Sequence, residues 1–248
     1  MSRFNIACET RELLLKHPFT IARGTKEIVP NVFVSLSADG YVGFGEAGPN
    51  TRYNEDAEKV TKFIESLPED IFENVSTGQD LAGKLAVRKP KIKSAMAAVE
   101  MAWLDWRGKK QASPLWKLWD APSNSTPPTS YTIGLDTLET MQGKVHAASE
   151  YPILKVKLGT EKDRDIIRAI REITDKPVRV DANEGWKTLG EAKGHISFLA
   201  DQDIKIVEQP MPSAMTAEMK ELRKWSPLPL IADESFKGEE DLDEIAEA

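Results

Sequence analysis

Two lysines lie two positions apart in the short apolar stretch 153–158. Side chains on a β-strand alternate between its two faces, so Lys155 and Lys157 point to the same face. Each ammonium group disfavours the charge of the other, and partial burial disfavours it further, so both effects lower a lysine pKa. A lysine that is neutral near physiological pH can act as a general base. For this pair alone, an edge strand with two solvated lysines is an equally good interpretation.

Three acidic residues follow the lysines at a regular interval. The step from Lys157 to Asp181 is 24 residues, the next step to Glu208 is 27, and the step to Asp233 is 25. Each step has the length of one βα unit, so consecutive strands deliver a charged side chain near their C-terminal ends. Singly, the segments that begin at these acids resemble a turn, a strand terminator and a helix cap. Four charged residues at one period favour a shared site.

Three carboxylates that converge from neighbouring strands repel one another unless a cation lies between them. An all-oxygen ligand set selects a hard ion, and we expect Mg²⁺, with positions left for water and substrate. A base beside a magnesium site indicates removal of a proton α to a carboxylate, with the metal stabilising the enediolate as its charge develops. Lys157 is then the expected base, and Lys155 lowers its pKa.

The elements that must position these residues fall into two groups. Residues 4 to about 49 predict a β-meander that a loop over 17–25 interrupts. Helices are expected from a cap at Asn54 to residue 66, over 80–86, and from a cap at Ser94 onward. Residues 121–129 are rich in proline, serine and threonine and predict a linker. We therefore expect an α+β domain over 1–125 and a second domain over 126–248.

In the second domain, short apolar runs alternate with longer amphipathic runs, which predicts βα units and a parallel sheet. The expected strands are 130–134, 153–158, 178–181, 204–208 and 229–233. A sequential parallel sheet with functional groups at its C-terminal end describes a (β/α)8-type barrel. An open doubly wound sheet is the rival, but it would usually carry a glycine-rich phosphate turn after its first strand, which residues 134–137 do not form.

Composition narrows the class of protein further. The 248 residues carry a net charge of −7, which argues against a nucleic-acid partner. No run approaches the roughly 18 apolar residues of a membrane span, and residues 1–7 lack the layout of a signal peptide. Cys8 is the single cysteine, which fits a reducing compartment. We expect a cytoplasmic protein without a membrane or nucleic-acid partner.

Four motifs together resemble the enolase superfamily, specifically its muconate-lactonizing subgroup. They are Lys155-Val-Lys157, Asp181-Ala-Asn183, Glu208-Gln-Pro210 and Asp233-Glu-Ser235. Residues 43–47 and 102–108 resemble that family's N-terminal capping domain. Residues 18–25 are similar to the mobile loop of dipeptide epimerases, including the Ala-Glu type.

The resemblance implies a role for each candidate residue. Asp181, Glu208 and Asp233 would hold Mg²⁺, Lys157 would be a catalytic acid/base and Lys155 its modulator. Arg23, in the capping loop, would contact the substrate. The implied activity is a Mg-dependent epimerisation of dipeptides, in which one lysine removes the Cα proton and an opposite lysine returns a proton to the other face. We also expect a small-molecule carboxylate substrate and a homo-oligomer.

Several alternatives stay open. Within the same subgroup they are cycloisomerisation of muconate, o-succinylbenzoate synthesis and N-acylamino acid racemisation. A non-catalytic, truncated relic is the alternative from another class. The sequence departs from the family at residue 248, where it ends in the helix after the fifth strand. Three further βα units and a second lysine on the sixth strand belong to the family pattern. We therefore expect an incomplete barrel, and proton exchange into only one epimer by these 248 residues alone.

Overall fold

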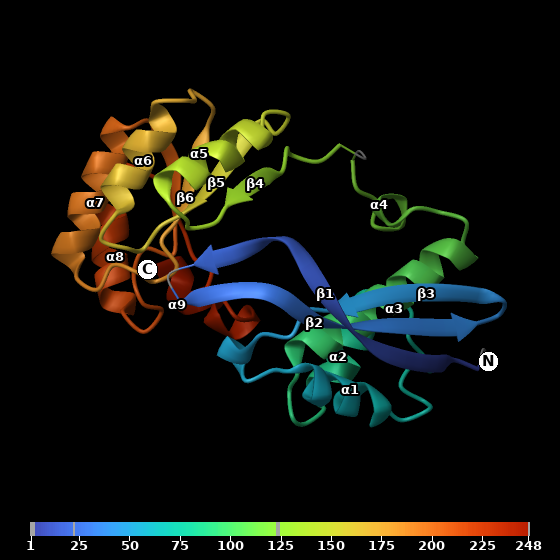
Figure 1. Cartoon of the computed structure of the whole chain (residues 1–248). Helices are drawn as coiled ribbons and strands as arrows, with labels where there is room; N and C mark the ends of the chain where they lie inside the picture. Colours follow the sequence, from blue (N-terminus) through green and yellow to red (C-terminus); the bar gives the residue numbers. More distant parts are fainter. Residues whose placement is uncertain (1–2, 22, 123–124, 248) are drawn as a thin grey trace. The chain divides into compact units, whose positions relative to one another are not determined.

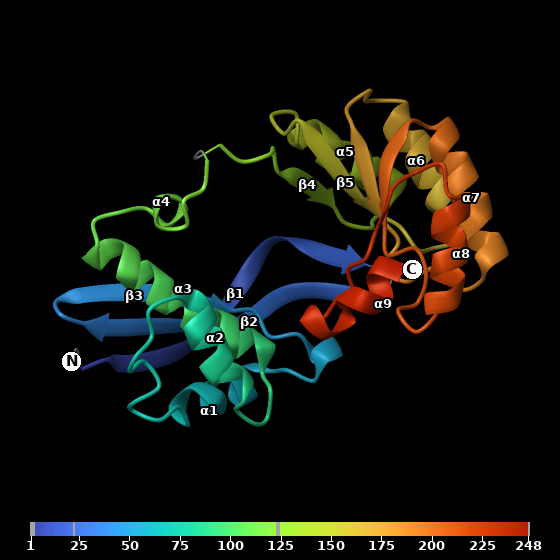
Figure 2. The same cartoon turned by 180° about the vertical axis from the view of Figure 1, so that it is seen from behind.

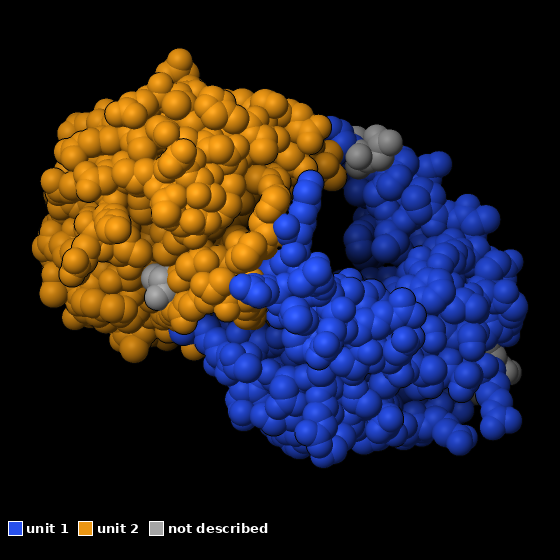
Figure 3. All heavy atoms as spheres, in the orientation of Figure 1, with its two compact units in different colours: residues 1–16, 27–125 blue, residues 17–26, 126–248 orange. Residues whose placement is uncertain are grey.

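The computed structural model describes residues 3–21, 23–122 and 125–247. The chain divides into two compact units (Figure 3). Residues 1–16 and 27–125 make the first unit, and residues 17–26 and 126–248 make the second. The predicted boundary after residue 125 places the segment 17–26 in the first domain. In the structure this segment groups with the second unit because it contacts the ends of that unit's strands.

The N-terminal part of the chain forms a three-stranded sheet in the order β1-β2-β3, and its first two strands continue into the segment 17–26 of the second unit (Figure 1). The strands of this sheet are β1 (Asn5–Ile21), β2 (Gly24–Ala38) and β3 (Tyr41–Ala47). Asp39 and Gly40 join β2 to β3 with φ angles of 52° and 81°, which suits the tight turn of an antiparallel hairpin. The predicted loop over 17–25 was wrong for most of its length, because β1 runs to residue 21 and β2 begins at residue 24.

One long helix lies on this sheet, and the other helices of the unit pack on that helix. The helices are α1 (Ala57–Glu65), α2 (Gly78–Ala86), α3 (Lys93–Lys110) and α4 (Leu115–Leu118), with a 3-10 turn η1 (Thr51–Tyr53) before them. α3 packs directly on β3. A Cβ atom added to Gly43 or Gly45 would collide with the backbone of Ala102 or Ala98 in α3. Glycine is therefore what permits the close approach of helix and strand.

Two predicted helix caps were wrong. Asn54 has a left-handed backbone after η1, and Asp56 caps α1 instead by accepting a hydrogen bond from Lys59 N at 2.8 Å. Ser94 lies inside α3, whose first backbone amide, Lys93 N, donates to the Glu55 carboxylate at 2.6 Å. A side chain distant in sequence can satisfy a helix end as well as a local cap does.

The second unit contains a five-stranded parallel sheet in the order β4-β5-β6-β7-β8. Its strands are β4 (Ser130–Ile133), β5 (Ile153–Lys157), β6 (Val178–Asp181), β7 (Ile204–Glu208) and β8 (Leu230–Ile231). Its helices are α5 (Leu138–Ala147), α6 (Asp163–Arg171), α7 (Leu189–Asp201), α8 (Thr216–Trp225) and α9 (Leu242–Glu247), with a 3-10 turn η2 (Glu239–Asp241) before α9.

The predicted alternation of strands and helices is confirmed. α5 to α8 each follow a strand, consecutive helices pack on one another, and α6, α7 and α8 line one side of the sheet (Figures 1 and 2). Sequential parallel strands with helices outside are the arrangement of successive units in a (β/α)8-type barrel. Aliphatic side chains from the strands and from the inner helix faces form a separate core in this unit, including Leu154, Val156, Val180, Val207 and Ile167.

A β-bulge interrupts the pairing of β6 with β7. Val178 pairs with Ile204 and Arg179 pairs with Ile206, so Lys205 has no counterpart in β6. The bulge advances β7 by one residue and brings Glu208 opposite Asp181. Without it, Val207 would take that position and Glu208 would point to the other face.

Residues 121–122 and 125–129 of the expected linker adopt neither helix nor strand, and residues 123 and 124 lie outside the described residues. Within the described ranges, no helix combines the length and the apolar character needed to cross a membrane.

Candidate active site

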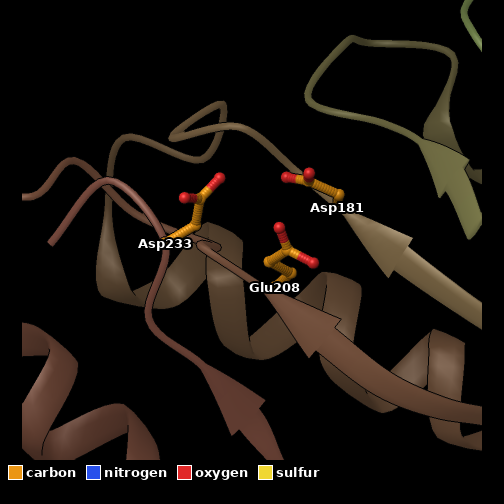
Figure 4. A group of neighbouring side chains, drawn as sticks. All are labelled: Asp181, Glu208 and Asp233. Carbon is orange, nitrogen blue, oxygen red and sulfur yellow. The ribbon is translucent and has the colours of Figure 1, made fainter. Parts of the chain in front are cut away.

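The charged residues predicted from the sequence period meet at the C-terminal edge of the parallel sheet. Lys157, Asp181 and Glu208 are the last residues of β5, β6 and β7, and they pair in register across the three strands. Asp233 lies two residues beyond β8, in the loop rather than in the predicted strand. Figure 4 shows the three carboxylates pointing into one common space, with one oxygen of each within 4.8 Å of the others.

Both lysines lie against these carboxylates. Lys157 Nζ is 2.6 Å from Asp181 Oδ2, and the same oxygen is 3.0 Å from Lys155 Nζ. Lys155 Nζ also donates to Glu208 Oε1 at 2.7 Å. The alternative of two solvated lysines on an edge strand is wrong, because β5 lies between two strands and Lys157 is buried. The lysines belong to the acidic site.

The pKa of Lys155 shifts in the direction opposite to the sequence prediction. Burial alone would lower this pKa, but the hydrogen bond to Glu208 and the attraction of Asp181 outweigh burial and raise it. The Lys155 ammonium therefore stays charged. For Asp181, burial raises the pKa, but the hydrogen bond from Lys157 and the attraction of both lysines outweigh burial and hold it below its ordinary value.

The other two carboxyl groups have raised pKa values. Burial is the main cause for Glu208, and the nearby charge of Asp181 adds to it, while Lys155 opposes both. Burial is also the main cause for Asp233, followed by repulsion from Glu234 and Asp181. These shifts are the electrostatic cost of burying carboxylates and of gathering them in one place. A bound cation would remove that cost.

The three carboxylates fit a hard divalent ion. They offer oxygen ligands only, as Mg²⁺ requires, and they come from three adjacent units of a rigid sheet. Asp181, Glu208 and Asp233 would hold the metal.

Gln209 lies within the motif Glu208-Gln-Pro210, whose residue types alone predict no role for its side chain. Its side chain is fully buried and joins the loop after β7 to the loop after β8. Gln209 Oε1 accepts hydrogen bonds from Asp233 N at 2.9 Å and Ser235 N at 3.0 Å. Gln209 Nε2 donates to Met211 O at 2.9 Å and to Ser235 Oγ at 2.8 Å. The Gln209 amide group thereby fixes the position of the Asp233 backbone, from which the carboxylate extends into the site.

Arg23 contacts carboxylates of the second unit. Its Nη2 donates to Glu234 Oε1 at 2.7 Å, and its Nη1 donates to the Asn183 carbonyl oxygen at 2.8 Å and lies 3.3 Å from Glu184 Oε2. All three partners are buried, whereas the Arg23 side chain is 38% exposed. The guanidinium thus binds the loops next to Asp181 and Asp233, while the Arg23 side chain as a whole stays partly exposed.

The other end of the segment 17–26 lies at β4 and β5. Leu135 N donates to Thr20 O at 2.9 Å, and the Phe19 ring centre is 6.0 Å from Lys157 Nζ. A Cβ atom on Gly134 would lie 3.1 Å from Thr20 O, so this contact is close. The segment therefore lies over the ends of strands that carry the site.

Comparison with known proteins identifies the same two parts of the chain. The family described as "Mandelate racemase / muconate lactonizing enzyme, N-terminal domain" matches residues 5–119, and the one described as "Enolase C-terminal domain-like" matches residues 138–248. A curated relative, the L-Ala-D/L-Glu epimerase of Bacteroides thetaiotaomicron, is 36% identical over 227 residues. The match covers 91% of this chain and 59% of that relative.

Two further proteins that are similar to this chain are also named epimerases. The L-Ala-D/L-amino acid epimerase of Pedosphaera parvula is 37% identical over 247 residues, covering 96% of this chain and 70% of the relative. The crystal structure of a dipeptide epimerase from Enterococcus faecalis, complexed with Mg and L-Leu-L-Tyr, superposes with a TM-score of 0.86 at 28% identity. It covers 97% of this chain, which spans 70% of that structure.

Proposed function

The chain belongs to the mandelate racemase/muconate lactonizing enzyme family of the enolase superfamily, and from that premise we propose that the protein is a Mg-dependent dipeptide epimerase. The observation that carries the proposal is the row formed by Lys157, Asp181 and Glu208. It puts an amine 2.6 Å from a carboxylate that can bind metal, at the C-terminal edge of a parallel sheet. This pairing of base and metal site suits proton abstraction next to a carboxylate.

Each residue of the site has a separate task. Mg²⁺, when bound by Asp181, Glu208 and Asp233, supplies the positive charge that stabilises the developing negative charge on the substrate carboxylate. Lys157 Nζ takes the proton from the substrate Cα. Lys155 is a fixed positive charge that holds Asp181 and Glu208 in place, because those two carboxylates keep it protonated.

The segment 17–26 serves substrate binding and water exclusion. Phe19 lies beside Lys157, where its ring limits the access of water to the substrate side of the base. Arg23, which is partly exposed beside the site, binds a carboxylate of the substrate. Within the described residues we assign Lys157 to one face of the reacting carbon and assign no residue to the opposite face.

Proton exchange in D₂O tests the proposal. The protein is incubated with Mg²⁺ and either L-Ala-L-Glu or L-Ala-D-Glu, and ¹H NMR follows the loss of the Glu Cα proton from each epimer separately. Lys157→Met should abolish exchange at that carbon while Mg²⁺ binding, measured by calorimetry, persists. Lys205→Met is the matched control, because Lys205 is an exposed lysine on β7 of the same sheet. It should exchange at the unaltered rate.

A substrate panel separates dipeptide epimerisation from the other reactions of the family. The same NMR assay is repeated with an N-acylamino acid, a muconate and hydrophobic dipeptides. Exchange confined to the N-acylamino acid, or turnover of muconate alone, would refute the dipeptide assignment and leave the site intact. Full activity of the Lys157→Met protein would refute the assignment of the base.

A further inference from the structure

We propose that Asp163 is a positioning residue that ties together the loops after β5, β6 and β7 and so holds Lys157, Asp181 and Glu208 in their common row. The inference deepens the proposed function and rests on it for the meaning of that row. Asp163 is the first residue of α6 and lies six residues beyond the proposed base. The hydrogen bonds of its side chain go to Gly159, Thr160 and Trp186, so its effect on the row is indirect.

Asp163 is 1% exposed, and its carboxylate receives four hydrogen bonds. Its Oδ1 accepts from Thr160 N at 2.8 Å and from Thr160 Oγ1 at 3.0 Å. Its Oδ2 accepts from Gly159 N at 3.0 Å and from the Trp186 indole Nε1 at 2.9 Å. A buried carboxylate is tolerated only when such donors surround it. One side chain therefore joins the loop after β5 to the loop after β6.

Trp186 extends the connection to a third loop. Its backbone N donates to Pro210 O at 3.1 Å, in the loop directly after Glu208. Its ring is 1% exposed and stacks on His195 of α7, with centroids 4.8 Å apart and an interplanar angle of 4°. The indole is thus held on its edge by Asp163 and on its face by His195, so it cannot rotate without breaking both contacts.

The connected loops also touch through their backbones. A Cβ atom on Gly185 would collide with Gly159, and one on Gly159 would collide with the carbonyl group of Ala182. Two hydrogen bonds lie one residue beyond the row itself, from Leu158 N to Asp181 O at 2.8 Å and from Ala182 N to Glu208 O at 3.0 Å. A displacement of the loop after β5 is therefore transmitted directly to the strand ends that carry the row.

Asp163→Asn is the direct test, because the amide has the same shape but only one acceptor oxygen. Its NH₂ group must face either Thr160 N or the pair formed by Gly159 N and Trp186 Nε1, and both sides present donors. Mg²⁺ affinity is measured by calorimetry, and the Trp186 indole proton is followed by NMR after assignment with Trp186→Phe. We expect about tenfold weaker Mg²⁺ binding, the effect typical of outer-shell partners, together with a shifted and faster-exchanging indole proton.

Asp165→Asn is the matched control. Asp165 is in the same turn of α6 and loses the same charge, but its side chain is 63% exposed and pairs with Arg168 across the helix surface. It should leave both readouts unchanged. If Asp163→Asn does not fold, Trp186→Phe serves instead, because it cuts the link between the loops and keeps an aromatic ring on His195. This variant should also weaken Mg²⁺ binding.

Three results would overturn the inference. One is a lower melting temperature of Asp163→Asn with unchanged Mg²⁺ affinity of the folded protein, which marks a role in stability alone. Another is unchanged Mg²⁺ affinity in Trp186→Phe. The third is an equal loss of affinity in Asp165→Asn. The proposed function fails separately, if the unaltered protein binds Mg²⁺ but exchanges no substrate proton.

Discussion

At the scale of single residues, amides and imidazoles position the charges that the acidic and basic residues supply. Gln209 uses both hydrogen-bonding atoms of its side chain to hold the loop that carries Asp233. Its backbone φ is 35°, an uncommon value for a residue other than glycine. Strain of this kind is kept only where surrounding contacts over-determine it. Its four hydrogen bonds supply those contacts.

Replacing Gln209 with Met keeps the length of the side chain and removes these bonds. The amide of Asp233 and the carbonyl of Met211 then lose a buried partner, which costs about 2 to 3 kcal/mol of unfolding free energy. Urea denaturation measures this loss, and calorimetry should show Mg²⁺ affinity about tenfold lower. Gln79→Met is the control, because Gln79 is exposed on α2. Unchanged Mg²⁺ affinity in Gln209→Met would contradict the role given to this amide.

His195 should make the stability of the fold depend on pH. Burial lowers the pKa of His195, while the charges of Asp163 and Glu191 oppose the shift and Arg164 adds to it. The unfolded chain therefore binds a proton more readily than the folded protein, starting near the ordinary value of 6.5. Stability should fall as the pH drops below 6.5 and through the lower pKa of the folded state.

His195→Phe tests this dependence, because Phe preserves a ring for stacking on Trp186 and cannot titrate. The difference in unfolding free energy between pH 7.5 and pH 5.5, measured by urea denaturation, should be smaller in the variant. His146→Phe is the control at a histidine on the exposed face of α5. An unchanged pH slope in His195→Phe would show that other groups cause the dependence.

At the scale of elements, the two units use different rules to bring helices onto strands. In the first unit a long helix lies directly against a strand, and glycines on the strand make room for its backbone. In the second unit each strand is only two to five residues long, and the helices that follow the strands pack on one another. Short strands place every strand end close to the edge where the charged residues gather.

Gly45→Ala should be strongly destabilising, because the added methyl group meets the backbone of Ala98 in α3. Overpacking of this kind costs about 1 to 3 kcal/mol. Gly83→Ala is the matched control, since a Cβ atom there meets nothing within 4 Å and the residue lies inside α2. It should stabilise the protein by about 0.5 to 1 kcal/mol. Thermal denaturation of both variants should give shifts of opposite sign, and equal shifts would contradict the packing argument.

At the scale of the whole molecule, segments far apart in sequence complete the site. Residues 17–26 belong to a hairpin near the N-terminus, yet they contact loops that follow β4, β6 and β8. Glu234 is 2% exposed and Arg23 is its ion-pair partner, so a cation from residue 23 neutralises a carboxylate 211 positions later. Closing such a long loop costs conformational entropy, which these charge-assisted hydrogen bonds help to offset.

Arg23→Met should loosen this segment. The Glu234 carboxylate would lose its charge-assisted hydrogen bond, which lowers the unfolding free energy by about 2 kcal/mol. Hydrogen exchange of the amides of residues 19–21 should accelerate, and KM for a dipeptide should rise if Arg23 also binds a substrate carboxylate. Arg11→Met is the control, because Arg11 and its partner Glu9 are both well exposed. Unchanged exchange in Arg23→Met would show that backbone contacts alone hold the segment.

Much of the second unit could be predicted because its signals are local. An apolar run of a few residues that ends in a charged one predicts both a buried strand and a polar strand end. Lys157, Asp181 and Glu208 each end a strand in the structure, and Asp233 follows one closely. Helix caps were harder to predict. Glu55 satisfies the first amides of α3 from 38 residues away, and no local pattern indicates such a partner.

The sequence by itself therefore determined the order of the βα units and the identity of the charged groups at their ends. Both can be predicted because the strand period and the hydrophobic pattern depend on residues that are close together in the sequence. Only the tertiary structure decided how those groups face one another. The bulge at Lys205 aligns Glu208 with Asp181, and Glu208 and Asp181 reverse the expected shift of the Lys155 pKa. Each of these effects depends on distances between residues on different strands, and such distances exist only after the chain has folded.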